Sequence, residues 1–197
     1  MLTPGLLLVA LAFVSGAVPY GLLLSRARGV DIRQVGSGNI GATNVARALG
    51  KRWAVPVLLL DLLKGFAPAV IARLLLPRTP SADLWIAGVM VAAVLGHMFT
   101  PFLRFRGGKG VATGFGVFLA IAPLAGAAGL VLYVGTYAAF RISSLGSLAG
   151  TLSALLATVL LPTPRPQCFA GAIIGLLIVA KHRANIARLL RGEEGKV

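Results

Sequence analysis

The stretch from residue 37 to residue 50, SGNIGATNVARALG, mixes glycines, hydroxyl and amide side chains with one arginine. Serine or asparagine near its start can cap a short helix, and Gly50 is the type of residue that ends one. Such a helix places Thr43 and Arg47, four residues apart, on one face. Free backbone amides, a hydroxyl and a guanidinium together favour a bound phosphate. A capped helix at a membrane surface explains the same residues equally well.

The start of this stretch also matches the glycine fingerprint of dinucleotide-binding folds. Residues 36–42, GSGNIGA, fit G-x-G-x-x-G/A letter for letter. The fingerprint requires a buried strand before it, a long helix after it and an acidic residue about 20 positions further on. Here a short mixture of polar and apolar residues precedes it, and positions 55–65 offer only Asp61 within an apolar run. The sequence therefore argues against a dinucleotide site.

A second glycine-rich stretch, RGGKGVATG at 106–114, places three glycines around Lys109 at the mouth of an apolar run. Glycines allow positive φ and can point successive amides at one anion, while the lysine adds a point charge. The stretch is not a Walker A loop, because G-x-x-x-x-G-K-[ST] is absent. A flexible basic loop that only orients the protein in a membrane is the simpler interpretation.

The third stretch, KHRANIARLLR at 181–191, is predicted to continue the last apolar run as a helix. At about 100° per residue, Lys181, Asn185 and Arg188 fall on one stripe, and His182 lies about 60° from Asn185. A basic helix end whose side chains reach the membrane surface would show the same pattern. The functional interpretation is strengthened because the predicted topology brings all three stretches to one face.

Polar residues also occur inside apolar runs. Asp61 and Lys64, three residues apart, can form a local ion pair, and charges within membrane segments are candidates for function. His97, in LGHM near the end of another run, could orient the glycine-lysine loop that follows it. A purely structural histidine is equally consistent with this position.

The composition of the chain places it in a membrane. Of its 197 residues, 57% are hydrophobic and only 12% are charged, which is too little polar surface to coat a soluble globule. The 19 lysines and arginines against 5 acidic residues give a net charge of +14. This excess indicates orientation signals and contact with anionic lipid, or an anionic substrate, and no nucleic-acid partner is expected. The single cysteine, Cys168, excludes an intrachain disulfide and a cysteine-cluster metal site, and no metal or other cofactor is expected.

Apolar runs long enough to cross about 30 Å of hydrocarbon recur along the chain. The run at 111–140 contains APLAG at 122–126, where a proline beside small residues can end one helix and begin the next. Splitting the run there predicts two short spans that neighbouring helices would have to shield. We therefore expect an all-α polytopic membrane protein, one integral-membrane domain over 1–197, with about seven transmembrane helices at 4–24, 53–76, 82–103, 111–123, 125–140, 143–161 and 166–180.

The distribution of basic residues predicts the orientation. The first run has no basic residue before it and arginines just after it, the reverse of a secretory signal peptide, so it should remain with its N-terminus outside. With seven spans, most of the 19 basic residues fall on one side, in the loops before residue 53, around 104–109 and after 180. That side, including the C-terminus, should be cytoplasmic.

Together with DLLKG at 61–65 and LGHM at 95–98, the three stretches resemble the bacterial acyl-phosphate-dependent glycerol-3-phosphate acyltransferases of the PlsY family. The resemblance runs from the first loop to the C-terminal helix, and VGSGNIGATNVAR with GGKGVATG is highly specific as a set. It implies seven transmembrane helices in the bacterial inner membrane. It also implies transfer of a fatty acyl group from acyl phosphate to the 1-hydroxyl of glycerol 3-phosphate, which gives lysophosphatidic acid and phosphate in the first step of phospholipid synthesis.

The resemblance further implies a site that faces the cytoplasm, with glycerol 3-phosphate, fatty acyl phosphate and membrane lipids as partners. Its residues are Arg47, Lys109, His182 and Asn185 in catalysis, Ser37, Gly38, Asn39, Thr43, Asn44, Gly107, Gly108, Gly110 and Arg188 in substrate binding, and Asp61, Lys64 and His97 in support. The sequence predicts no oligomeric state and no preferred acyl chain.

The chemistry of this reaction fits the residue types. Acyl phosphate is an activated mixed anhydride, so positioning and charge stabilisation can suffice for its transfer. We expect Lys109 and Arg47 to neutralise the acyl phosphate and the leaving phosphate. His182 and Asn185 would hold glycerol 3-phosphate, and the hydroxyl proton could go to His182 or to the donor's own phosphate.

Two other possibilities can be weighed from the sequence. Many acyltransferases that use acyl thioesters carry a His-x4-Asp pair, but Phe102 stands five residues after His97 and Ala187 five after His182. A transporter or channel for organic phosphates would also need basic loops, and the charged pair in the second span favours it. Against it, the basic candidates cluster on one side, whereas alternating-access sites lie near the midplane between repeats.

Overall fold

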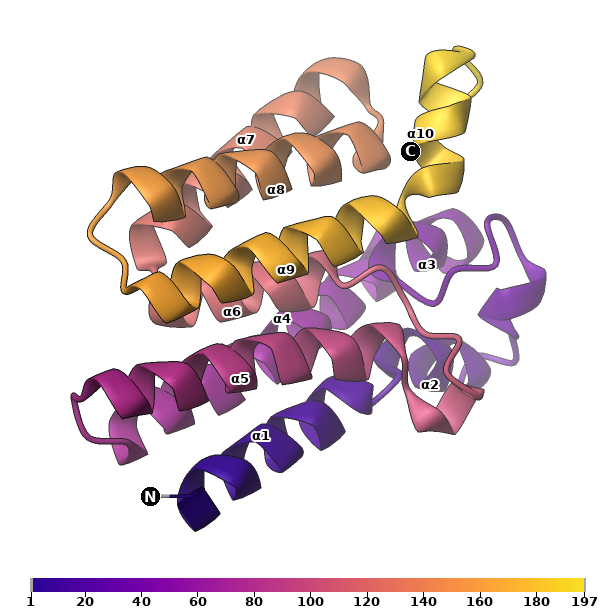
Figure 1. Ribbon diagram of the computed structural model, residues 1–197. Coiled ribbons are helices and arrows are strands. Elements are labelled where there is room, and N and C mark those ends of the chain that lie inside the picture. Colours follow the sequence, from indigo (N-terminus) through magenta and orange to yellow (C-terminus); the bar gives the residue numbers. More distant parts are fainter. Residues whose placement is uncertain (1, 197) are drawn as a thin grey trace.

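The computed structural model describes residues 2–196, and the regular elements in this range are all helical (Figure 1). Two short 3-10 helices, η1 (Ile32–Gln34) and η2 (Pro101–Leu103), lie in loops between the longer helices. The α-helices are α1 (Leu2–Ala17), α2 (Tyr20–Arg26), α3 (Ala42–Leu49), α4 (Lys51–Leu75), α5 (Pro80–Met98), α6 (Val111–Ile121), α7 (Pro123–Phe140), α8 (Ser143–Leu160), α9 (Arg165–Lys181) and α10 (Arg183–Leu190). The predicted all-α fold is confirmed.

Helices form the seven predicted spans, with breaks at residues 18–19 and 99–100 in the first and third, and the spans differ in length. In the described part of the chain, five segments are long and apolar enough to cross a membrane: Thr3–Arg26, Lys51–Leu75, Pro80–Leu103, Pro123–Phe140 and Ser143–Leu160. A sixth, α9, reaches the same length only with α10, to which it is bent by 60°. The 11 residues of α6 make about 16 Å of helix, roughly half of the hydrocarbon thickness. Of the two short spans expected in 111–140, only the first is short, because α7 has 18 residues.

The predicted break near Pro123 is confirmed, and the structure shows what makes an early helix end possible. α6 ends at Ile121 and α7 begins at Pro123, a position in the first helical turn where proline is tolerated. The last carbonyls of a helix lack partners within it. The Arg73 side chain of α4 donates to the carbonyls of Ala120 and Ile121, at 3.0 and 3.3 Å. Because bare carbonyls are unfavourable away from water, this side chain stabilises the end of α6.

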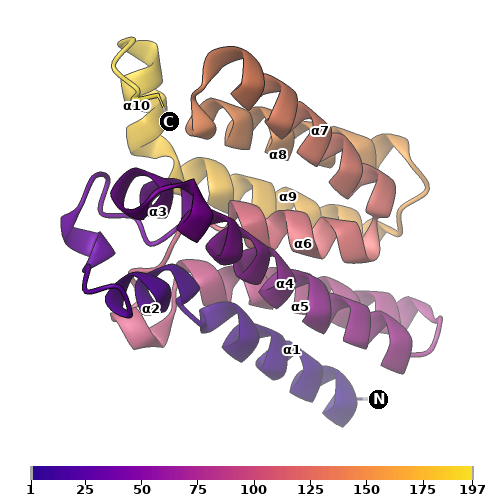
Figure 2. The same cartoon turned by 180° about the vertical axis from the view of Figure 1, so that it is seen from behind.

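Small residues let α6 pack closely against α4 at the centre of the bundle (Figure 2). A Cβ atom on Gly116 would overlap the carbonyl oxygen of Leu62, and one on Gly65 would overlap that of Thr113. Such positions allow helix backbones to approach each other in a membrane. Phe118, on another face of α6, is fully buried in a core shared with α5 and α9. The N-terminus of α6, where the glycine-lysine loop enters, is therefore held from several sides.

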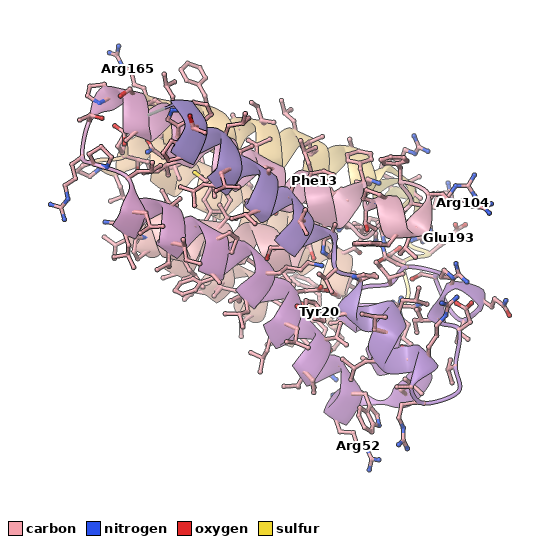
Figure 3. The ribbon with its side chains drawn as sticks, turned by 90° about the horizontal axis from the view of Figure 1, so that it is seen from below. Phe13, Tyr20, Arg52, Arg104, Arg165 and Glu193 are labelled. Atoms are coloured by element: carbon pink, nitrogen blue, oxygen red, sulfur yellow. The ribbon has the colours of Figure 1, made fainter. Side chains whose placement is uncertain are left out.

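The polar segments gather at one end of the bundle. Figures 1 and 2 show α2, α3 and α10 at this end and the start of α1 at the opposite one. In Figure 3, Arg52, Arg104 and Glu193 lie toward the same end, while Arg165 lies at the other. We call the end that carries α2, α3 and α10 the polar end. As expected from the charge distribution, the three basic stretches meet there.

Candidate active site

Two cavities adjoin at the polar end. One, of about 230 Å³, lies between α3, α4, α6, α7 and α8, and we call it the apolar groove. The other, of about 460 Å³, lies between the loop before α3 and α10, and we call it the basic pocket. The residues that line both are Ser37, Asn39, Arg47, Lys109, Asn185 and Glu194. With the exception of the glutamate, these residues come from the three stretches that the sequence singled out.

The apolar groove is bounded mostly by hydrocarbon. Its apolar wall is built by α4, α6 and α7 through Leu58, Leu59, Leu62, Val111, Ala112, Phe115, Leu130 and Val134. Two of these residues, Leu59 of α4 and Val134 of α7, are each 58% exposed, so the groove opens sideways from the bundle. In a membrane, this flank faces the acyl chains of the surrounding lipid. The groove can therefore accept an alkyl chain.

The Asn44 side chain, on α3, organises the loop that precedes this helix. Its Nδ2 donates to the loop carbonyls of residues 32 and 35, at 3.1 and 2.8 Å, and its Oδ1 accepts from the Ser37 N–H at 3.0 Å. The predicted serine or asparagine cap of α3 is wrong, because the N-cap residue is Gly41, which has no side chain to bond to the first helical amides. Asn39 instead accepts from the Gly41 N–H at 2.9 Å. Gly50 ends α3 at φ +88°, as predicted.

Thr43 and Arg47 face the same cavity, as their spacing predicted. The Thr43 hydroxyl lies 2.8 Å from the hydroxyl of Ser143 on α8, which lies 3.3 Å from the Tyr133 hydroxyl. The Arg47 guanidinium donates to the carbonyl of Gly195 at 3.0 Å. α3 thus brings a hydroxyl to the groove and a cation to its junction with the basic pocket.

The glycines of the glycine-lysine loop permit close packing and do not form the predicted cradle of free amides. The Gly107 N–H donates to the Met98 carbonyl and the Gly108 N–H to the His97 carbonyl, both at 3.1 Å. These two amides are therefore not available to an anion. A Cβ atom on Gly108 would overlap the His97 imidazole, whereas Gly110 is the loop glycine with positive φ, at +82°.

Lys109 projects from this loop to the junction of the two cavities. Its Nζ donates to Asn185 Oδ1 at 2.5 Å. Burial lowers the pKa of Lys109 to about 8, Glu194 acts in the opposite direction, and Arg188 and Arg47 add to the lowering. The ammonium is consequently charged at neutral pH but has given up much of its water. A compact cation in this state is well suited to contact a phosphate oxygen.

The third stretch is not one continuous helix, because the chain bends by 60° at His182, just beyond Lys181, the last residue of α9. His182 Nδ1 lies 2.8 Å from the Ile178 carbonyl, so this nitrogen carries the proton and Nε2 is an acceptor in the neutral ring. Burial lowers the pKa of His182 to about 4. Despite the bend, Lys181, Asn185 and Arg188 all line the basic pocket.

The polar residues within the spans form a buried network behind the glycine-lysine loop. Asp61 Oδ1 lies 2.7 Å from Lys64 Nζ, which confirms the predicted ion pair, and Lys64 also donates to the Val18 carbonyl at 2.9 Å. The Thr113 hydroxyl donates to the Asp61 carbonyl at 2.9 Å and lies 3.1 Å from His97 Nδ1. The network links α4, α5 and α6 beneath the loop, and Asp61 and His97 also line the groove.

Sequence reasoning missed the contributions of α8 and of the segment after α10. The serines near the start of α8 that line the groove are Ser143, Ser144 and Ser147. Their position next to Arg141, at the predicted inner end of a span, could have indicated them. Glu194 accepts from Asn185 Nδ2 at 2.6 Å and from the Ser144 hydroxyl at 2.8 Å. Two adjacent acidic residues in a basic tail usually indicate a solvated surface, so nothing in the sequence marked Glu194.

The basic pocket is suited to a phosphate group. Its cationic side chains are Arg47, Lys109, Lys181 and Arg188, and hydroxyl and amide groups lie between them. Guanidinium and ammonium groups bind phosphate by charge and by hydrogen bonds. Within residues 2–196, no group of three or more His, Cys, Asp and Glu side chains is placed to hold a metal ion.

Comparison with known proteins gives matches over nearly the whole chain. A family model described as glycerol-3-phosphate acyltransferase matches residues 6–192. The chain is 52% identical over 195 residues to a glycerol-3-phosphate acyltransferase of Anaeromyxobacter sp. (strain K), covering 98% of this chain and 97% of that protein. The structure is similar to the crystal structure of PlsY, an integral membrane glycerol 3-phosphate acyltransferase, in its glycerol 3-phosphate form, with a TM-score of 0.92, 41% identity and coverage of 98% and 96%. For the lysophosphatidic acid form the TM-score is 0.89, at 40% identity and coverage of 98% and 95%.

Proposed function

The chain belongs to the glycerol-3-phosphate acyltransferase family, and from this premise we propose that its acyl donor is a fatty acyl phosphate. Family membership makes it a multi-pass membrane enzyme that acylates glycerol 3-phosphate and forms lysophosphatidic acid. The proposal adds the donor, the roles of the site residues and the side of the membrane on which they act.

The observation that carries the proposal is the junction of two unlike cavities at Lys109. The apolar groove opens toward lipid, and the basic pocket carries several cations. A fatty acyl phosphate has an alkyl chain that fits the first and a phosphate that suits the residues shared by both. Glycerol 3-phosphate is small and charged, and it suits the second. The acyl carbonyl and the attacking hydroxyl then meet between Lys109, Asn185 and Arg47.

Charge stabilisation is the main task of the side chains in this arrangement. Lys109 and Arg47 neutralise the donor phosphate, on which negative charge grows as it leaves. Asn185 and Arg188 hold glycerol 3-phosphate in the basic pocket, and Ser37, Asn39 and Thr43 add hydrogen bonds. Because acyl phosphate is already activated, positioning of this kind can supply most of the required acceleration.

The transfer step balances without a covalent enzyme intermediate. The 1-hydroxyl oxygen forms a bond to the acyl carbon, the bond from that carbon to the phosphate oxygen breaks, and inorganic phosphate leaves. Between the two candidates for the hydroxyl proton, a phosphate oxygen of the donor is favoured. The reason is that burial lowers the pKa of His182 to about 4, which makes its free Nε2 a weak base. His182 Nε2 then accepts from the other hydroxyl of glycerol 3-phosphate and orients the substrate, because the single proton of the attacking hydroxyl goes to the phosphate.

The polar end faces the cytoplasm of the bacterial inner membrane in this proposal. Two arguments support it: the basic residues concentrate there, and the start of α1 lies at the opposite end of the bundle. Glycerol 3-phosphate would then enter from the cytoplasm, and the acyl chain from the inner leaflet.

The decisive experiment compares donors. Purified protein in detergent is incubated with labelled glycerol 3-phosphate and either a fatty acyl phosphate or the matching acyl thioester. We expect lysophosphatidic acid and an equal amount of inorganic phosphate from the first donor alone, and no product from a Lys109→Ala preparation purified in the same way. Product from the thioester alone would refute the proposed donor. Product from neither would favour the phosphate transporter, which counterflow of labelled glycerol 3-phosphate in liposomes would then detect.

The proton acceptor is tested separately with His182→Ala. If the donor phosphate takes the proton, turnover at saturating substrate should remain within about tenfold of the parent, because only an orienting hydrogen bond is lost. A loss of several orders of magnitude in a folded variant would assign the general base to His182 instead.

A further inference from the structure

The chain turns back after α10 and brings an acidic side chain to the junction of the two cavities. Gly192, at φ +71°, makes the turn, and the Glu194 side chain that follows is only 6% exposed. Glu194 Oε2 accepts from Arg188 Nε at 2.6 Å, and Oε1 accepts from the Ser144 hydroxyl at 2.8 Å and from Asn185 Nδ2 at 2.6 Å. One carboxylate thus joins α8 and α10 beside the candidate site.

These hydrogen bonds determine which way the Asn185 amide points. Partial burial acts to raise the pKa of Glu194, but the hydrogen bonds from Arg188, Asn185 and Ser144 hold it below its usual range, so the group is ionised at neutral pH. An ionised carboxylate can only accept hydrogen bonds, and the Asn185 NH₂ must therefore face it. The amide oxygen then faces Lys109, where it accepts from Nζ. Without the carboxylate, the amide could rotate and present its NH₂ group to the ammonium, which would repel it.

We propose that Glu194 is a positioning residue, which fixes the Asn185 amide and through it the Lys109 ammonium for the transfer step. The inference rests on the proposed function of Lys109. Glu194 makes no contact with either substrate in this role, and it acts through the chain of hydrogen bonds from Glu194 to Asn185 and from Asn185 to Lys109.

A carboxylate at a phosphate site could instead be a competitor that occupies the place of the substrate. The structure favours positioning, because the apolar groove and the basic pocket keep volumes of about 230 and 460 Å³ with the Glu194 side chain in place. Glu194 lines both cavities without filling either. Its three hydrogen bonds also tie it to donors on two helices, which is the geometry of a fixed support. The two interpretations predict opposite effects when the carboxylate is removed.

The charge of Glu194 provides a readout that a purely structural residue would not give. The titratable and charged groups that line the two cavities with Lys109 are Glu194 of the tail, Arg188 of α10, Lys181 of α9, Arg47 of α3, His182 at the bend, Asp61 of α4 and His97 of α5. The carboxylate raises the pKa of Lys109, whereas Arg188 and Arg47 lower it. Removing the negative charge should therefore make the ammonium lose its proton at a lower pH.

The experiment compares Glu194→Gln and Glu194→Ala with Glu193→Gln. Glu193 is the matched control, because it is adjacent, carries the same charge, pairs only with Arg191 among the described ion pairs and is 57% exposed. For each protein, kcat and KM are measured from pH 6 to 10, with size-exclusion profiles in detergent as a check of folding. Independently of turnover, the pH dependence of Lys109 labelling by an amine-reactive reagent is followed by mass spectrometry.

We expect both Glu194 variants to lose about tenfold or more in kcat, with KM changed less, while Glu193→Gln matches the parent. The alkaline limb of the rate and the onset of Lys109 labelling should both move to lower pH in Glu194→Gln. Unchanged kcat and labelling would overturn the inference, as would higher activity or a lower KM for glycerol 3-phosphate. If Glu194→Ala does not fold, Glu194→Gln decides alone. If the parent forms no product, the proposed function fails, but labelling still reports whether Glu194 sets the state of Lys109.

Discussion

Replacing Lys109 with arginine keeps the positive charge but changes its shape, and this separates a phosphate-binding cation from an orienting one. An orienting lysine acts through charge alone, so arginine should preserve both membrane insertion and activity. Lys109 instead reaches a defined acceptor, since its Nζ lies 2.5 Å from Asn185 Oδ1. The loop that carries it cannot retreat, because the neighbouring Gly108 is packed against the His97 imidazole. A wider, planar guanidinium therefore has to displace the contact or the substrate.

The size of the effect follows from the contact that is lost. A hydrogen bond to a charged group contributes about 1.5–3 kcal/mol. Losing the lower end of that range in the transition state corresponds to about tenfold in rate, since tenfold is about 1.4 kcal/mol. We expect Lys109→Arg to insert normally and to lose at least about tenfold in kcat/KM. The matched control is Lys51→Arg, because Lys51 is an exposed lysine at the start of α4 and lines neither cavity.

The assay measures initial rates of lysophosphatidic acid formation by purified protein in detergent, with the yield of inserted protein quantified for each variant. If Lys109→Arg inserts and turns over like the parent, the loop is a topology signal. The catalytic assignment would then have to rest on the first and third stretches.

Three further predictions can be checked with the same preparation. Gly108→Ala should lower both thermal stability and turnover, because the new Cβ overlaps the His97 ring, while Gly135→Ala, with open space around it, should change neither. A normal melting temperature and rate for Gly108→Ala would contradict the packing argument. Burial lowers the pKa of Lys109 to about 8, and a lysine loses its charge as pH rises through its pKa, so turnover should fall between about pH 7 and 9. A rate that holds to pH 10 would show that the ammonium is not required. In a Cys168→Ser background, single cysteines at residue 109 and near the C-terminus should be labelled only from the cytoplasm, and labelling of residue 109 from outside would overturn the proposed orientation.

Much of the framework is predictable because a bilayer restricts it strongly. The break before Pro123 and the meeting of three separated stretches at one end both follow from proline chemistry and from the distribution of basic residues. The bend at His182 is not predictable in this way, since residues 181–191 contain neither glycine nor proline and fit a continuous helix. The bend arises where tertiary packing buries the His182 ring.

The details of the site were harder to predict than its location. Composition suggested free amides in the glycine-lysine loop, but Gly107 and Gly108 donate to the carbonyl end of α5 instead. Which amides are already bonded depends on the path of the backbone, and residue types alone do not reveal it. Glu194 was missed for a similar reason, because its burial depends on a turn at Gly192 that brings it back over α8 and α10.

The sideways opening of the apolar groove determines how the concentration of the lipid-like substrate must be expressed. An acyl donor that enters through the flank formed by Leu59 and Val134 comes from the lipid or detergent phase. Its concentration is therefore given as its mole fraction within the bilayer or micelle. The concentration of the water-soluble substrate, which enters the basic pocket, is expressed per unit volume of solution. Adding detergent at constant amounts of enzyme and both substrates should therefore dilute one substrate and leave the other unchanged. Apparent KM values for the acyl donor then have meaning only at a stated surface composition, and an inhibitor built on the groove would gain potency by partitioning into lipid before it binds.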